Sequence, residues 1–143
     1  MLSKIKGETL KDHIKLNLAA AYIEEGDHEK GQYILNEINQ KNLRDDLPKM
    51  VYWLNTSVAH FRLNEKEEFN NIYNSKKTLI DKFKDNELYA SNIAILDICN
   101  LIINEDLKEA KMLLDQALLK YTDDKNQKEL KEISQIIEAR ARD

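Results

Sequence analysis

The fold is decided by the stretch NLAAAYIEEGDHEKG, which occupies residues 17–31. Its first half is rich in alanine and ends at Glu25-Gly26. Glycine adopts the left-handed backbone conformation that closes many helices without a Cβ penalty. Asp27 follows and offers a side-chain cap for a second helix. That helix carries one apolar stripe, formed by Gly31, Ile34, Leu35 and Ile38. The stretch therefore predicts two helices joined by a tight turn.

The same alternation continues along the chain. Helices that are apolar on two seams alternate with helices that are apolar on one stripe. Stacked hairpins need this alternation, because the first helix of each pair contacts both its own partner and the next pair. The chain holds only three Gly and one Pro, and no segment alternates like a strand. We therefore expect an all-α fold with hairpins at about residues 9–40, 47–84 and 86–121 and a capping helix at about 125–142.

Composition and charge limit the compartment and the partners. The length of 143 residues is that of one domain. A formal net charge of −4 lacks the basic excess that neutralises phosphates, so no nucleic-acid partner is expected. No apolar run approaches the roughly 20 residues of a membrane-spanning helix. The lone Cys99 cannot form an internal disulfide, which fits a reducing compartment or no particular compartment. We expect a cytoplasmic protein, with no direct membrane insertion of this segment.

The first hairpin resembles the signature of the tetratricopeptide repeat. That family has a Leu and a small residue, then a Tyr, a turn Gly and a small residue in the second helix. Here these residues are Leu18, Ala19, Tyr22, Gly26 and Gly31. The small residues let two helix backbones approach closely. The resemblance implies a right-handed α-solenoid of about three hairpins that binds other proteins.

The resemblance is looser in the later hairpins. Trp53 and Ser57 match family positions in the second copy, whereas His60 stands for the Tyr and Asn64 for the turn Gly. In the third copy, residues 106–118 match well and the preceding helix does not. The turn residues recur at intervals longer than the roughly 34 residues of the family, at Gly26, Asn64 and Glu105. An irregular superhelix is therefore expected.

The N-terminus allows two interpretations. Leu2 and Ile5, followed by Gly7, look like the end of a second helix whose first half is absent. The chain would then be the C-terminal part of a longer protein, with more repeats or a membrane tether upstream. The alternative is a native start at Met1. A longer reading frame upstream would decide between the two.

No set of residues has the spacing of a catalytic or metal site. His13, His28 and His60 have no second histidine three or four residues away. Cys99 lies in an apolar helix without a base that would activate its thiol. Glu65 and its acidic neighbours are typical of a solvated helix end, although paired carboxylates are also the one basis for an enzyme alternative. We expect no enzyme, no cofactor and no metal.

The resemblance also implies a binding face. In the tetratricopeptide family, the first helix of each pair lines a concave groove that holds a partner. Carried over to this sequence, the groove would contain Leu16, Ala20, Ile23, Leu54, Asn55, Val58, Phe61, Arg62, Ile95, Cys99 and Ile102. This set is mostly apolar and suits an amphipathic helix or an extended apolar segment. The hypothesis is a non-catalytic scaffold or adaptor that binds a protein or peptide.

Two alternatives stay open for the same residues. The first is that they form core, covered by tight curvature of the solenoid or by the last helix. The second is structural self-association, with the groove filled by another copy of the chain or by an upstream segment, since exposed apolar patches commonly meet their own copies. A homo-oligomer is therefore a further expectation to test.

Overall fold

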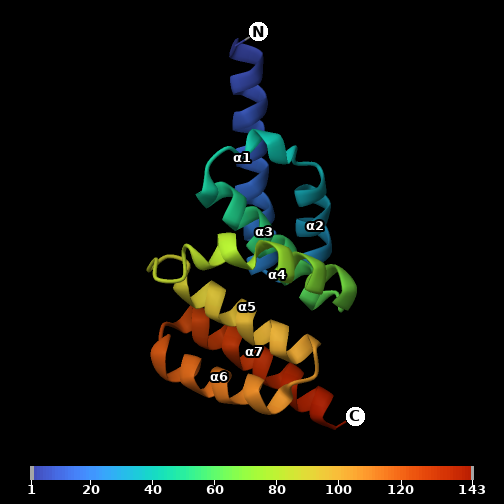
Figure 1. Cartoon of the computed structure of the whole chain (residues 1–143), viewed down its shortest axis with the longest axis vertical. Helices are drawn as coiled ribbons and strands as arrows, with labels where there is room; N and C mark the ends of the chain where they lie inside the picture. Colours follow the sequence, from blue (N-terminus) through green and yellow to red (C-terminus); the bar gives the residue numbers. More distant parts are fainter. Residues whose placement is uncertain (1, 143) are drawn as a thin grey trace. The chain divides into compact units, whose positions relative to one another are not determined.

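The computed structural model describes residues 2–142, with side chains from residue 7 onward. This part of the chain is helical and contains no strand, which confirms the all-α prediction. Its elements are α1 (Leu2–Glu24), α2 (His28–Asn36), the 3-10 helix η1 (Gln40–Asn42), α3 (Asp46–Arg62), α4 (Lys66–Asp81), α5 (Ala90–Ile103), α6 (Leu107–Lys120) and α7 (Asp124–Ala141) (Figure 1).

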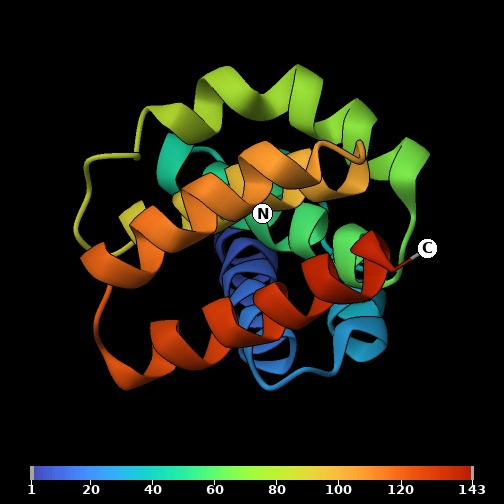
Figure 2. The same cartoon turned by 90° about the horizontal axis from the view of Figure 1, so that it is seen from below.

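The helices belong to two compact units, Met1–Ile80 and Asp81–Asp143. In the first unit, α1 and α2 form a hairpin and α3 packs against both. In the second unit, α5 and α6 form a hairpin and α7 packs against both of these helices (Figure 2). The right-handed solenoid describes how hairpins would stack along the whole chain, and it stays a prediction.

One backbone motif closes all three hairpins. The second residue after each first helix has a positive φ, which is 98° at Gly26, 58° at Asn64 and 66° at Glu105. The N–H of this residue bonds to the carbonyl three residues earlier, and the next N–H bonds to the carbonyl five residues earlier, as from Asp27 to Tyr22 at 2.9 Å. This Schellman arrangement satisfies the last carbonyls of a helix. The three turn residues expected from the sequence are confirmed.

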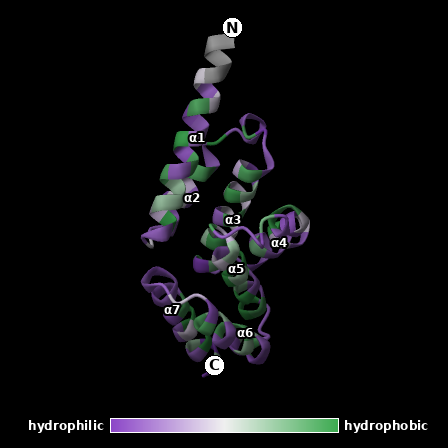
Figure 3. Ribbon diagram, turned by 90° about the vertical axis from the view of Figure 1, so that its left-hand side faces the viewer, coloured by the Kyte–Doolittle hydropathy of each residue, from purple (hydrophilic) through white to green (hydrophobic). Residues whose placement is uncertain are grey.

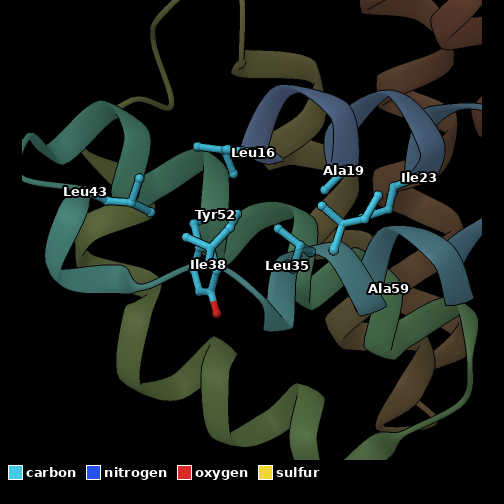
Figure 4. Close-up of a cluster of buried hydrophobic side chains, with 9 residues drawn as sticks. Leu16, Ala19, Ile23, Leu35, Ile38, Leu43, Tyr52 and Ala59 are labelled. Atoms are coloured by element: carbon cyan, nitrogen blue, oxygen red, sulfur yellow. The ribbon is translucent and has the colours of Figure 1, made fainter. Parts of the chain in front are cut away.

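The core of the first unit forms where α1, α2 and α3 meet. Gly31 of α2 lies against α1 so closely that a Cβ on it would collide with the Ile23 side chain and lie 3.2 Å from the Ala19 carbonyl oxygen. The close approach expected from small residues is thus confirmed. Around this contact gather the buried side chains of Leu16, Ala19, Ile23, Ile34, Leu35, Ile38, Leu43, Tyr52 and Ala59 (Figure 4).

Aromatic rings attach α4 to α3. The ring of Phe69, whose side chain is fully buried, lies 6.2 Å from that of Phe61 on α3, and it also stacks on Tyr73 of its own helix at 5.8 Å between centroids. Such pairs contribute about 0.5–1.5 kcal/mol each beyond the area they bury. Phe69 follows its turn at the same place as Gly31 in the first hairpin. The second hairpin therefore uses ring packing where the first uses close backbone approach.

Two local features differ from the sequence prediction. The helix end expected at Gly7 is wrong, because α1 begins at Leu2 and continues through this glycine. A glycine inside a helix costs only about 1 kcal/mol relative to alanine, so it does not by itself end one. The sequence pattern also does not predict the short helix η1. Pro48 lies in the first turn of α3, where its missing N–H is tolerated.

Two glycine-to-alanine changes test the close approach of α1 and α2. Gly31→Ala should lower the free energy of unfolding by about 1–3 kcal/mol, because the new methyl group collides with Ile23. Gly7→Ala is the matched control, since no atom lies within 4 Å of its added Cβ. It should raise stability by about 0.5–1 kcal/mol through helix propensity alone. Urea denaturation followed by circular dichroism measures both changes. If both variants changed the free energy of unfolding by the same amount, the contact between α1 and α2 at Gly31 would not be tight.

Candidate partner-binding site

Most residues expected in the groove are buried in the structure. Leu16 and Ile23 are 3% and 6% exposed and belong to the core of the first unit. These two side chains therefore present almost no surface to a partner. The other buried members of the expected set are Leu54, Phe61, Ile95, Cys99 and Ile102.

The remaining members of the set keep part of their surface. Asn55, Val58 and Arg62 are half-buried and recur on one face of α3 at intervals of three and four residues. Asn55 Nδ2 donates a hydrogen bond to the carbonyl oxygen of Val51 at 2.8 Å, and Val51 and Val58 both pack against the core. Ala20 is half-buried on α1, which packs against α3. We call Asn55, Val58 and Arg62 the α3 face.

A small hollow lies elsewhere in the first unit, and the sequence prediction missed it. Its volume is about 210 Å³, and it is lined by Gln40, Leu43, Lys49, Tyr52, Trp53, Lys76 and Leu79. Small-molecule sites usually measure about 300–1,000 Å³. The hollow is therefore of a size for one side chain rather than for a cofactor.

The chemistry of this hollow comes from two lysines and two aromatic rings. Lys76 Nζ lies 4.7 Å from the centroid of the Trp53 ring, within cation–π range. Gln40 Nε2 donates a hydrogen bond to the Tyr52 hydroxyl at 3.4 Å. Burial raises the pKa of Tyr52, so this hydroxyl stays neutral and the lysines supply the charge. The side chains converge from η1, α3 and α4, which is why no single stretch of sequence reveals them.

A polar cluster links α2 to the turn between α3 and α4. Gln32 Nε2 donates a hydrogen bond to Glu65 Oε1 at 2.9 Å, and His60 Nδ1 lies 3.0 Å from the same oxygen. The hydrogen bond from Gln32 and then the one with His60 hold the pKa of Glu65 below its usual value. In the sequence, His60 stands where the repeat family has a Tyr, and Glu65 belongs to an acidic helix end that was expected to face solvent. The structure brings these two residues together with Gln32. Its evident role is to fasten the second hairpin to the first.

Other candidate sites find no support in the described residues. Within residues 2–142, no three His, Cys, Asp or Glu side chains gather closely enough to hold a metal ion. The Cys99 thiol is buried. No described helix has both the length and the apolar character needed to cross a membrane.

The lowered pKa of Glu65 predicts that the stability of the protein depends on pH. A carboxylate with a lowered folded pKa stabilises the protein above its unfolded pKa, near 4.5, and this contribution disappears as the pH falls through the folded pKa. Glu65→Gln should therefore destabilise the protein at pH 7, and this effect should shrink as the pH falls through the folded pKa of Glu65. Because the Glu65 side chain is 38% exposed, the loss should stay below about 1 kcal/mol.

Urea titrations of both proteins at several pH values measure this effect. Glu67→Gln is the matched control, since Glu67 is an exposed carboxylate at the start of the same helix and is not part of the cluster, and the loss of stability should be larger for Glu65→Gln than for this control. A Glu65→Gln profile parallel to the wild-type profile would contradict the role of the cluster.

Comparison with known proteins does not extend the sequence resemblance. No family model, no curated protein and no solved structure matches the chain. The tetratricopeptide family therefore remains a resemblance carried mainly by residues 17–31.

Proposed function

We propose that the chain is a non-catalytic scaffold or adaptor that holds an apolar helix or peptide of another protein. The observation that carries this proposal is the α3 face, where Asn55, Val58 and Arg62 keep surface at helical spacing. An apolar contact, an amide and a guanidinium on one helix face offer both affinity and orientation to a partner segment. Ala20 on the neighbouring α1 has a small side chain, which leaves room there for a side chain of the partner.

The rigidity of this face supports the proposal further. Val51 and Val58 pack on a core formed by three helices, and Asn55 is fixed by its hydrogen bond to Val51. A face held in this way loses little conformational entropy when a partner binds. The partner would place one or two apolar side chains against Val58 and polar groups against Asn55 and Arg62.

The burial of several expected groove residues reduces the surface that this groove could offer to a partner. Leu16 and Ile23 stabilise the core, so a site that uses the α3 face is smaller than the groove expected from the sequence. The structural alternative, self-association, is favoured by a different observation, which is the row of exposed apolar side chains at Leu10, Ile14 and Leu18 of α1.

A peptide selection tests binding at the α3 face. Peptides selected from a random display library on the wild-type protein should be rich in apolar residues spaced as on one helix face. Their affinity should fall at least about tenfold for Val58→Glu, because the partner would bury an unpaired carboxylate. Fluorescence anisotropy with a labelled peptide measures the change, and circular dichroism checks that the variant is folded.

Leu119→Glu is the matched control, since Leu119 is 84% exposed on α6 and is not part of the α3 face. Phe61→Glu is unsuitable, because Phe61 is 4% exposed and a charge there would disturb the core. Peptides that bind wild type and Val58→Glu equally would overturn the α3 face as the site.

A further inference from the structure

The hollow lined by η1, α3 and α4 has a chemical character that the proposed function does not use. Among its lining residues, which all lie in the described part of the chain, two are lysines, Lys49 and Lys76, and none is acidic. All of them belong to the first compact unit. Figure 3 shows hydrophilic and hydrophobic positions mixed on α3 and α4, the helices that supply most of this lining. The hollow therefore combines positive charge with apolar surface.

The two lysines are not neutralised by the part of the chain that the structure describes. Lys76 Nζ lies 4.7 Å from the centroid of the Trp53 ring, and an aromatic face holds an ammonium group without cancelling its charge. Lys49 precedes Trp53 by one turn of α3. Within the described residues, neither ammonium group pairs with a carboxylate. An anion in the hollow would therefore meet two positive charges without having to displace an existing ion pair.

A buried hydroxyl group supplies a third donor. Tyr52 is 6% exposed, and its oxygen accepts a hydrogen bond from Gln40 Nε2. The hydroxyl still carries its own proton, and no acceptor for that proton lies within the described residues. Burial raises the pKa of Tyr52, so the proton is retained at neutral pH. In Figure 4 the hydroxyl oxygen points away from the other labelled side chains.

The rest of the lining favours a ligand with an apolar body. Leu43 is buried, and Trp53 and Leu79 are half-buried. A strongly hydrated inorganic anion gains nothing from these three side chains, whereas an apolar group removes their remaining surface from water and is stabilised in proportion to the area buried. The volume of about 210 Å³ limits this group to roughly the size of one side chain.

We propose that the hollow binds a small amphipathic carboxylate, with one charged group and an apolar body about the size of one side chain. Lys49 and Lys76 bind the carboxylate through charge-assisted hydrogen bonds, which are stronger than neutral ones. The Tyr52 hydroxyl donates a further hydrogen bond to it, and the apolar body packs against the leucines and the Trp53 ring. Because these contacts come from η1, α3 and α4, a bound ligand joins all three elements and stabilises the first unit.

This site is separate from the α3 face. An α-helix has about 3.6 residues per turn, so Lys49, Tyr52 and Trp53 project from a different side of α3 than the residues of the α3 face. The proposal therefore goes beyond the proposed function. Binding of a small carboxylate in the hollow and binding of a peptide at the α3 face can each fail without the other.

Titration with phenylacetate, followed by two-dimensional amide nuclear magnetic resonance, tests the site. A ligand of this size should bind with a dissociation constant on the order of 1 mM. The largest shifts should fall on the amides around the lining residues of η1, α3 and α4. Phenylacetamide, which keeps the ring without the charge, and acetate, which keeps the charge without the ring, are matched control ligands. Each should bind at least about tenfold more weakly than phenylacetate.

Three results of this titration would overturn the proposal. The first is the absence of shifts around the hollow at about 10 mM phenylacetate, well above the expected dissociation constant. The second is equal binding of acetate, which would show an anion site without an apolar part. The third is equal binding of phenylacetamide, which would show that the two lysines contribute nothing.

Substitutions in the lining test the role of each donor. Lys49→Gln, Lys76→Gln and Tyr52→Phe should each raise the dissociation constant for phenylacetate at least about threefold, because each removes one donor to the carboxylate. Lys108→Gln is the matched control, since Lys108 is exposed on α6 outside the hollow. Val58→Glu should weaken the selected peptides but leave phenylacetate binding unchanged. Unaltered phenylacetate binding in all three lining variants would overturn the proposal and leave the α3 face untouched.

Discussion

The architecture depends on the left-handed backbone of one residue in each hairpin turn. At Gly26, Asn64 and Glu105 the chain reverses through the same pair of hydrogen bonds, and the next helix starts directly afterwards. Because this turn is short and fixed by two hydrogen bonds, it determines which faces of the two helices meet. Gly26 adopts this conformation without a Cβ and asparagine tolerates it at position 64, so the conformational cost falls mainly on Glu105.

The helix pairs that follow these turns solve the packing problem in different ways. In the first pair, Gly31 lets α2 come against α1, and the buried side chains of both helices then meet α3. In the second pair, Phe69 occupies the corresponding position and its ring lies between Phe61 and Tyr73. One turn geometry thus supports both a close helix pair and a wider one.

The sequence predicts the local features of the fold better than the surfaces. Turn residues and helix periodicity are local, so the turn at Gly26 and the all-α class could be foreseen. Periodicity shows that a residue such as Leu16 is apolar on a helix, but not which neighbouring element covers it. The expected groove and the core therefore drew on the same residues. The contacts of Lys76 with Trp53 and of Gln32 with Glu65 join distant segments, and no local pattern encodes them.

The position of the one tryptophan in the chain gives the first unit an optical signature of its own. Trp53 lies on α3 in the first unit, edge-on to Tyr52 and under the ammonium group of Lys76. Its emission will report only how the surroundings of α3 and α4 change. The far-ultraviolet ellipticity, in contrast, sums over the helices of both units. Comparing the two signals in one denaturation experiment will therefore reveal whether the halves of the chain melt as one cooperative block or in succession.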